Sequence, residues 1–484
     1  MALLLDKRGD EFRITEDVVK AAAANWRSGR QIMALLLDKR GDEVQITEDV
    51  IKAAAEYGSY EIMALLLDKR GDEIQITEVV VKAAAGNENS GKEIIELLLN
   101  KYRDKVQITE DVVKAAAANL NHGQEIMALL LDKREDDVQI TEVVVKAAAA
   151  NMSHTQHIIA LLFDKRGDEV QITGDIVKAA SGSGSRKTMV LLLDKRGDKV
   201  QITEDVVKAA AVNTRYGQEI MALLLDKRGE EVQITGDIVK AASGSGSRET
   251  MVLLLDKRGD EVQITEDVVK AAAANTRYSQ EIMALLLDKR GEEVQITGDI
   301  VKAASGSGSR ETMVLLLDKR GDKVQITEDV VKAAAANLNH GQEIMALLLD
   351  KRGDDVQITE VVVKAAAANW RSGRQIMALL LDKRGDEVQI TEDVIKAAAG
   401  NENSGKEIME LLLDKRGDEF RITEVVIKAA AGNENSGKEI MALLLDKRGD
   451  EFCITEDVVK AAAANWRSGR QIMALLLDKR GDEV

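Results

Sequence analysis

The chain has 484 residues, of which 45% are hydrophobic, 31% are charged and 2% are aromatic, and it contains no proline. This mixture is typical of a folded protein whose core is packed with small and aliphatic side chains. The formal net charge is −17, with acidic and basic residues interspersed. The sequence therefore lacks the basic patch of a nucleic-acid-binding protein, and we expect no nucleic-acid partner.

The chain also lacks membrane and disulfide signals. Its apolar runs are far shorter than the ~20 residues that a membrane-spanning helix needs, so we expect no membrane contact. Cys453 is the single cysteine, which excludes an internal disulfide and favours a reducing, cytoplasmic location.

One segment recurs from end to end. Fifteen whole repeats and one partial repeat, eleven of 32 residues and four of 30, begin at Met1, Met33, Met63, Ile95, Met127, Ile159, Met189, Met221, Met251, Met283, Met313, Met345, Met377, Met409, Met441 and Met473. Such a period predicts a stacked-repeat protein, and we expect one continuous solenoid over residues 1–484. Copying has extended the array, since Met189 to Thr250 and Met251 to Thr312 differ at three positions only.

The first half of each repeat predicts a short alanine-rich helix. In the repeat that starts near Val44, Thr47 is a good N-cap, and Glu48 and Asp49 place negative charge in the first turn. We expect Lys52 to point outward and to pair with Glu48 one turn earlier. The alanines that follow would let a neighbouring helix come close.

The second half predicts a leucine-rich helix. An asparagine such as Asn87 ends the first helix, where a left-handed backbone is common. The serine and the glutamate three residues later predict capping boxes, as at Ser90 with Glu93, Ser404 with Glu407 and Ser436 with Glu439, with Ser28 and Gln31 as the amide version. Gly41 is placed for a C-cap. A helix this apolar must be covered by neighbouring repeats.

The remaining residues of the repeat, Gly-Asp-Glu-Val-Gln-Ile, are too few for another helix and predict an extended connector whose apolar side chains plug between repeats. The predicted fold is therefore all-α, an αα-solenoid of about fifteen and a half helix-loop-helix repeats. Neither end shows a polar capping repeat, so Leu3, Leu4 and Leu5 would lie partly uncovered. We expect a fragment of a longer protein, with self-association through the uncapped ends as the alternative.

The stretches Ile94 to Leu99 and Ile440 to Leu445, with the glycine after the leucines in the second, resemble the second helix of the ankyrin repeat. The proline-containing turn and the hairpin finger of that family are missing. The repeat is more similar to the short ankyrin-like repeats of fungal receptors of the nucleotide-binding type, in which such arrays form a C-terminal sensor region. This resemblance implies a recognition function and supplies no catalytic residue.

The sequence contains no complete residue pattern of a catalytic, cofactor or metal site. Gly182 to Thr188 ends in Arg-Lys-Thr, but Arg186 replaces the glycine that a phosphate-binding loop has before its lysine. His154 and His157 are three residues apart, and no further ligands complete a metal site. We therefore expect no enzyme activity, no cofactor and no metal.

The inter-helix loop is the variable part of the repeat and holds most of the aromatic residues. Exposed aromatic and arginine side chains on a rigid scaffold are typical of binding hot spots, although unconstrained drift would also make loops vary. The candidate partner-binding residues are Trp26, Arg27, Tyr57, Tyr60, Glu88, His122, Tyr216, Tyr278, His340, Trp370, Arg371, Trp466 and Arg467. We expect a scaffold that binds a protein or peptide, as the sensor array of an intracellular receptor; a structural spacer or self-assembling protein is the alternative.

Overall fold

A computed structural model describes residues 13–134, 137–167, 169–184, 186–196, 200–291, 294–321, 324–417, 419–449 and 453–481. In these ranges helices alternate with loops and short extended segments, and no β-strand occurs there. The predicted all-α fold, an αα-solenoid of helix-loop-helix repeats, is confirmed. Leu3, Leu4 and Leu5 lie outside the described residues.

Each repeat contributes a first and a second helix. The first helices are α2 (Glu16–Ala23), α4 (Glu48–Tyr57), α6 (Glu78–Gly86), α8 (Glu110–Ala118), α10 (Glu142–Ala150), α12 (Gly174–Ser183), α14 (Glu204–Val212), α16 (Gly236–Ser245), α18 (Glu266–Ala274), α20 (Gly298–Ser307), α22 (Glu328–Ala336), α24 (Glu360–Ala368), α26 (Glu392–Ala399), α28 (Glu424–Gly432) and α30 (Glu456–Ala464). The second helices are α3 (Gly29–Arg40), α5 (Tyr60–Arg70), α7 (Gly91–Lys101), α9 (Gly123–Lys133), α11 (Thr155–Arg166), α13 (Arg186–Arg196), α15 (Gly217–Arg228), α17 (Arg248–Arg258), α19 (Ser279–Arg290), α21 (Arg310–Arg320), α23 (Gly341–Arg352), α25 (Gly373–Arg384), α27 (Gly405–Arg416), α29 (Gly437–Arg448) and α31 (Gly469–Gly481). Short 3₁₀ helices, η1 (Gly41–Glu43), η5 (Gly353–Asp355) and η6 (Gly385–Glu387), follow α3, α23 and α25.

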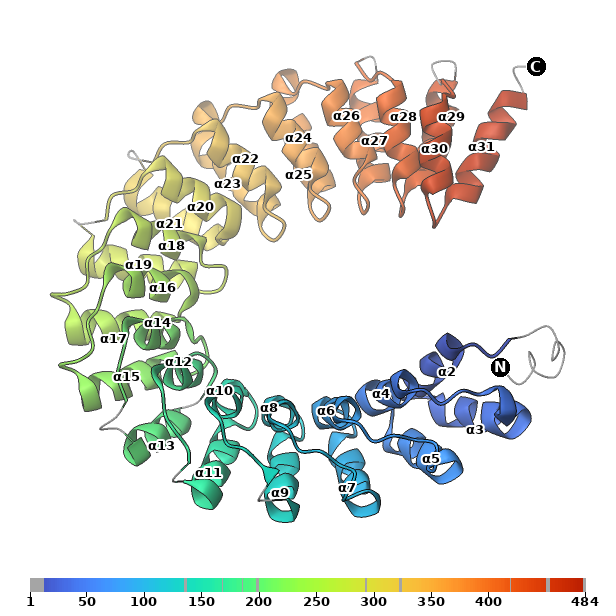
Figure 1. Ribbon diagram of the computed structural model, residues 1–484. Coiled ribbons are helices and arrows are strands. Elements are labelled where there is room, and N and C mark those ends of the chain that lie inside the picture. The colour runs from blue at the N-terminus through green and yellow to red at the C-terminus, as the bar shows by residue number, and fades with distance from the viewer. Residues whose placement is uncertain are drawn as a thin grey trace. The chain divides into compact units, whose positions relative to one another are not determined.

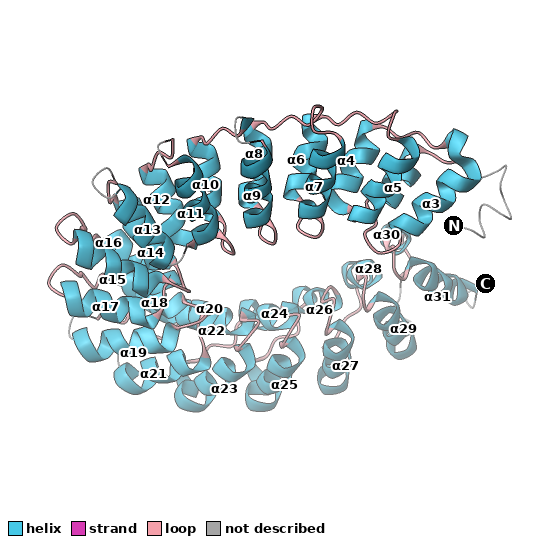
Figure 2. Ribbon diagram, turned by 90° about the horizontal axis from the view of Figure 1, so that it is seen from below, coloured by secondary structure: helices cyan, strands magenta, loops and turns pink. Residues whose placement is uncertain are grey.

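Contacts divide the chain into two compact units, residues 1–238 and 239–484, with the division inside α16. Within each unit the first helices form one row and the second helices form another that packs against it (Figures 1 and 2). Neighbouring first helices pack more closely than neighbouring second helices do, so the row of first helices lies on the inner side of the curve, as α4 to α12 show in Figure 1. We call the exposed surface of this row, formed by the second and fifth residues of each first helix, the inner face.

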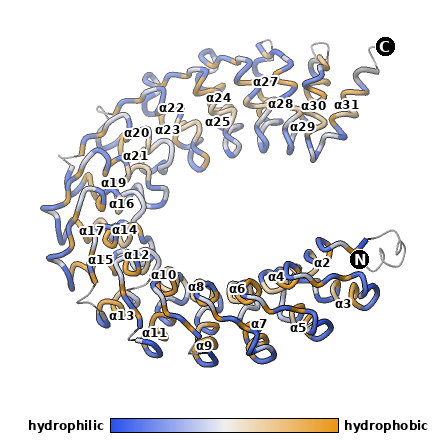
Figure 3. Tube along the Cα trace, in the orientation of Figure 1, coloured by the Kyte–Doolittle hydropathy of each residue, from blue (hydrophilic) through white to orange (hydrophobic). Residues whose placement is uncertain are grey.

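Small side chains explain the close packing of the first helices. Val80 and Ala84 of α6 are fully buried, as are the bulkier Ile94 and Leu98 of α7. Alanine adds little width to a helix, whereas leucine and methionine hold the second helices farther apart. Figure 3 shows apolar residues along the helices and polar residues in the loops. Helices this short are marginal alone, so the stacked neighbours supply their stability.

A ladder of buried asparagines joins the loops. The Asn119 side-chain amide donates to the carbonyl oxygens of Ala85 and Asn87 in the preceding repeat, both at 3.0 Å, and its oxygen accepts from the backbone N–H of His122 at 2.8 Å. The same donation to the preceding repeat occurs at Asn87, Asn151, Asn213, Asn275, Asn337, Asn369, Asn401, Asn433 and Asn465. The expectation of a left-handed backbone was wrong, since Asn119 is extended and no described residue has a positive φ.

The helix ends differ in part from the predicted caps. Thr47 caps α4 as predicted, accepting from the Val50 N–H at 3.4 Å, and its hydroxyl also donates to Glu16 of the preceding repeat at 2.5 Å. The predicted serine capping boxes do not form, because the backbone before the second helix is not extended there, as at Ser404 with ψ 10°. Ser28, Ser90 and Ser436 likewise make no side-chain cap bond. Gly41 has φ −54° and ψ −36°, so helical geometry continues into η1 instead of a left-handed C-cap.

The connectors and the second helices carry further contacts between repeats. Val44 is extended and buried, as expected for a connector that plugs between repeats. Lys69 pairs with Asp38 of the preceding repeat at 3.3 Å, and the Arg70 guanidinium donates to the carbonyl oxygen of Gly41 at 3.1 Å. Among the described helices, none has the length and apolar character that crossing a membrane requires.

Candidate functional site

The predicted loop residues lie on one edge of each unit, where successive loops contact one another. Arg371 donates to the side-chain oxygen of Asn339 in the preceding loop at 2.8 Å, and Asn121 donates to the carbonyl oxygen of Glu88 at 2.9 Å. These bonds and the asparagine ladder hold the loop backbone, so the side chain directly after each ladder asparagine is free to vary.

The large aromatic residues of this loop edge are exposed, as predicted. Trp26, Trp370 and Trp466 follow ladder positions and are 57%, 47% and 71% exposed. The Arg27 guanidinium lies 4.8 Å from the centre of the Trp26 ring, and Arg467 lies 5.1 Å from that of Trp466, distances at which a cation and a ring attract each other.

The structure does not gather the predicted residues into one patch. The loops of Glu402 and Glu434 separate Trp370 from Trp466. Tyr57 ends α4 and Tyr60 begins α5, and both are exposed, as is Glu88; Tyr216, Tyr278, His122 and His340 are half-buried beside the start of a second helix. The loop edge is thus a row with gaps, and its role in binding stays a prediction.

The inner face shows a more regular pattern. The lysine at the fifth position of a first helix pairs with the aspartate at the second position of the next first helix, as in Lys428 with Asp457 at 2.7 Å. The other pairs are Lys20–Asp49, Lys82–Asp111, Lys146–Asp175, Lys178–Asp205, Lys208–Asp237, Lys240–Asp267, Lys270–Asp299, Lys302–Asp329 and Lys364–Asp393. The hydrogen bond from Lys82 lowers the pKa of Asp111 below its ordinary value, and Asp111 raises the pKa of Lys82.

The expected pairing of Lys52 with Glu48 inside one helix was wrong. The Glu48 carboxylate instead accepts a hydrogen bond of 2.5 Å from the Thr77 hydroxyl of the next repeat. Polar side chains on the inner face therefore connect repeats rather than turns of one helix.

Four repeats depart from this pattern. Val79, Val143, Val361 and Val425 replace the aspartate and are 44%, 43%, 42% and 40% exposed. The lysines that precede them, Lys52, Lys114, Lys332 and Lys396, form no ion pair in the part of the chain that the structure describes. Each of these places combines an exposed apolar side chain with a lysine that lacks the ion-pair partner in the next repeat.

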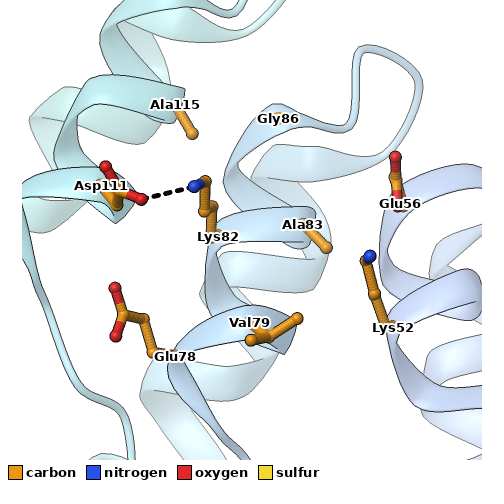
Figure 4. A pocket seen from close by; sticks show the side chains of 9 residues that line it. All are labelled: Lys52, Glu56, Glu78, Val79, Lys82, Ala83, Gly86, Asp111 and Ala115. Carbon is orange, nitrogen blue, oxygen red and sulfur yellow. Dashed lines mark hydrogen bonds and ion pairs between the residues drawn. The ribbon is translucent and has the colours of Figure 1, made fainter. Parts of the chain in front are cut away.

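A groove of about 570 Å³ lies at the first of these places. Figure 4 shows Val79 and Ala83 on α6 between Lys52 on α4 and the Lys82–Asp111 pair. The groove is lined by Lys52, Glu56, Glu78, Val79, Lys82, Ala83, Gly86, Asp111 and Ala115. Its floor of Val79 and Ala83 offers contacts to apolar groups, and the Lys52 ammonium, which has no ion-pair partner among the described residues, offers one contact to an acidic group. Glu56 and Glu78 add negative charge to the lining.

The residues of this site were not predicted, although the sequence contains a signal for them. Four first helices begin Glu-Val-Val where the others have aspartate in second place. From the sequence, valine at the second position looks like an extension of the apolar stripe of the helix. The structure shows instead that this position faces solvent and that the aspartate which usually occupies it pairs with a lysine of the neighbouring repeat.

Other features give weaker sites. A notch of about 300 Å³ lies at the shortened loop before α13, between Met152 and Tyr216. Gly182 and Ser183 there belong to α12 and Arg186 begins α13. No group of three or more potential metal ligands occurs among the residues with described positions.

The comparison with protein families decides the family of the chain. The family described as "Domain of unknown function (DUF7104)" matches residues 3–33, 35–63, 65–94, 97–127, 129–158, 161–187, 191–221, 223–251, 253–283, 285–313, 315–345, 347–377, 379–409, 411–441 and 443–473. The chain belongs to the DUF7104 family. From residues 35–63 onward, each matched segment of the DUF7104 family begins in a second helix and continues through the connector and the next first helix. No curated protein matches the chain.

The chain is also similar to solved structures of the pentatricopeptide repeat protein PPR10. PPR10 in complex with an 18-nt psaJ RNA element is 15% identical, with a TM-score of 0.43 over 96% of this chain and 73% of PPR10, and a cysteine-to-serine variant in complex with that RNA gives the same values. PPR10 from maize is 14% identical, with a TM-score of 0.34 over 97% of this chain and 73% of PPR10.

The exclusion of a nucleic-acid partner was wrong, because two of these similar helical-repeat structures contain bound RNA. Helical repeats can bind RNA by presenting two or three side chains to each base. The net charge, on which the exclusion rested, does not decide against such local contacts.

Proposed function

We propose that this protein is a non-enzymatic binding scaffold whose inner face holds an extended segment of a protein partner. The observation that carries the proposal is the groove at Val79, where an exposed apolar floor lies beside the unpaired Lys52. A surface with no binding role would be expected to repeat the Lys–Asp pair there, as the neighbouring repeats do.

The composition of the groove favours a polypeptide. Val79, Ala83 and Ala115 offer contacts for aliphatic side chains, and Lys52 offers one charge. A single strand of RNA is usually held by stacking on aromatic rings and by a run of cations, and the lining of the groove has no aromatic residue.

The proposal extends to the setting of the scaffold. The resemblance of Ile94 to Leu99 and Ile440 to Leu445 to ankyrin-like sensor repeats supports a recognition region of an intracellular receptor. In such a receptor, partner binding on the inner face would be the recognition event. The structural spacer is the competing function, and it requires no ligand.

The test is a selection of random peptides on the full-length chain, followed by anisotropy measurements with fluorescein-labelled peptides. Gly86→Trp should obstruct the groove, because Gly86 lines it, and the backbone there accepts a side chain, since nothing lies within 4 Å of a Cβ built at Gly86. Ala274→Trp is the matched control, since it changes the equivalent position between two paired repeats. We expect selected peptides to lose about tenfold in affinity for the first variant only.

Three results would count against the proposal. Failure to select any peptide would favour the spacer, and growth of the molar mass with concentration in light scattering would favour self-assembly. Tighter binding of a labelled single-stranded oligouridylate than of any peptide, lost in the Gly86→Trp variant, would make RNA the ligand of the groove.

A further inference from the structure

The inner face lacks a carboxylate at four places where the repeat pattern would put one. We propose that each place takes a carboxylate from an acidic segment of the protein partner, which pairs with the lysine that has no aspartate of its own. This inference rests on the proposed function and adds the chemical class of the bound segment.

The chain contains its own comparison for this inference. In all ten described cases where aspartate occupies the second position of the next first helix, the lysine pairs with it. In the four cases with valine, the lysine forms no ion pair. The lysine is thus positioned to pair with a carboxylate at the second position of the next first helix. Where valine occupies that position, the carboxylate is missing.

The surroundings of Lys52 show what a ligand would meet. Glu56 follows Lys52 by one turn on the same helix, and Glu78 accepts a hydrogen bond of 2.7 Å from the Thr109 hydroxyl. Asp111 already pairs with Lys82. A ligand carboxylate beside Lys52 would form the ion pair that the aspartate at the second position forms with lysine in other repeats. An aliphatic side chain next to that carboxylate would pack on Val79.

The other three lysines have less competing charge. The position of Glu56 is occupied by Ala118 after Lys114, by Ala336 after Lys332 and by Gly400 after Lys396. These sites should therefore bind a carboxylate at least as well as the site at Lys52, because no acidic side chain of the same helix lies one turn beyond the ammonium.

The sites occur as one pair in each unit, at Val79 and Val143 and at Val361 and Val425, and a paired repeat separates the two members of each. Packed helices lie about 8–10 Å apart, so two sites on alternate helices are roughly 16–20 Å apart. An extended chain rises about 3.3 Å per residue, which corresponds to about five or six residues. We infer that the bound segment carries two acidic residues at that spacing, each beside an aliphatic residue.

The probes are fluorescein-labelled peptides that contain two Asp-Leu dipeptides joined by glycine and serine, with a series of linker lengths, and matched peptides with Asn-Leu. Anisotropy on the full-length chain should give an affinity about tenfold higher for the aspartate peptide at the optimal linker, because two linked contacts reinforce each other. The advantage should shrink at high salt. Equal affinity of the aspartate and asparagine peptides would overturn the inference.

The decisive variant carries Val79→Asp, Val143→Asp, Val361→Asp and Val425→Asp, which supplies the missing carboxylates. It should fold, because the eleven other first helices have aspartate there, and it should bind the aspartate peptide no better than the asparagine peptide. Valine to threonine at the same four positions is the matched control, since it keeps the shape and adds no charge, and it should preserve the preference for aspartate.

A gain of binding gives a second, independent readout. Asp111→Val should release Lys82 and create a site one repeat away from that of Lys52. Peptides whose aspartates are about three residues apart should then bind more tightly than they bind the natural protein. No gain for these peptides would contradict the inference even if the fourfold variant lost binding.

The two proposals can fail separately. If peptides from the random selection bind the natural chain and keep their affinity for the fourfold aspartate variant, the inner face binds another class of peptide and only this inference is wrong. If no selected peptide binds the natural chain, the proposed function is wrong as well. If an oligouridylate binds and loses affinity in the fourfold variant, the lysines hold phosphate rather than carboxylate.

Discussion

Asn119 donates a hydrogen bond of 3.0 Å to the carbonyl oxygen of Asn87, its own equivalent one repeat earlier. Its amide also reaches the carbonyl of Ala85, and its oxygen holds the N–H groups of Asn121 and His122. One buried side chain therefore ends a helix, shapes a loop and joins two repeats.

Asn119→Ala should consequently destabilise the protein far more than its exposed neighbour does. Removing the amide leaves buried backbone groups without partners, at a cost of roughly 1–3 kcal/mol each. Asn121→Ala, at an exposed position with one bond to the carbonyl of Glu88, is the control and should cost about 1 kcal/mol or less. Urea unfolding followed by circular dichroism measures the free energy of unfolding of both variants. An equal loss in the two variants would show that the buried asparagines contribute no special stability.

Gly373→Ala should also destabilise the stack. A side chain there would lie 2.7 Å from the Ala366 carbonyl oxygen and 3.1 Å from the terminal methyl of Ile408 in the next repeat. Gly432→Ala should leave the free energy of unfolding unchanged or raise it. Nothing lies within 4 Å of a Cβ built at Gly432, and alanine is more favourable than glycine in a helix by about 1 kcal/mol. Thermal unfolding should therefore shift in opposite directions for the two variants.

Removal of the loop tryptophans should separate the two candidate surfaces. Trp26→Ala, Trp370→Ala and Trp466→Ala together should change the free energy of unfolding by less than about 0.5 kcal/mol per site, since all three side chains are exposed. Peptides that bind the inner face should keep their affinity for this variant. A tenfold loss in the anisotropy assay would instead place the partner on the loop edge, as the sequence analysis expected.

The stability of the folded protein should decrease in acid, at a pH determined by the pKa values of the inner-face aspartates. Lysine hydrogen bonds lower the pKa of Asp111, Asp393 and Asp457 in the folded chain below the ordinary 3.8. A carboxylate with a lowered pKa stabilises the folded state above its unfolded pKa, and that contribution is lost as the pH falls through the folded value. The melting temperature should thus be nearly constant from neutral pH to about pH 5 and should fall below about pH 4. In the fourfold Val→Asp variant the fall should be steeper.

The local reasoning from the sequence worked where one repeat contains the whole cause. The caps at Thr47, the alanine stripe of α4 and the plugging of Val44 follow from residues within one repeat, and the structure agrees. The reasoning failed where the partner belongs to a neighbouring repeat. For Asn87, Glu48 and Lys82, possible partners occur within the same repeat. Their observed hydrogen-bond or ion-pair partners are instead residues of a neighbouring repeat, about 30 positions away in the chain.

The same distance in the chain explains why the inner-face site could not be predicted. An exposed valine and a solvated lysine are ordinary in isolation. Val79 and Lys52 become a site only because stacking brings the second position of one helix to the fifth position of the preceding one. Whether these two positions come together depends on how neighbouring first helices are rotated relative to each other. The pattern of apolar residues in the sequence does not determine that rotation.

The asparagine ladder also bears on how such an array changes its length. Each ladder bond joins a repeat to its immediate predecessor, and Asn213, Asn275 and Asn337 bond in the same way to a serine and a glycine carbonyl of the shorter repeat before them. Excision of Met189 to Thr250, or insertion of another copy, would join residues that already face identical neighbours elsewhere in the chain. Recombination between these copies can therefore lengthen or shorten this protein by two repeats at a time while the new junction keeps the same hydrogen-bonding groups.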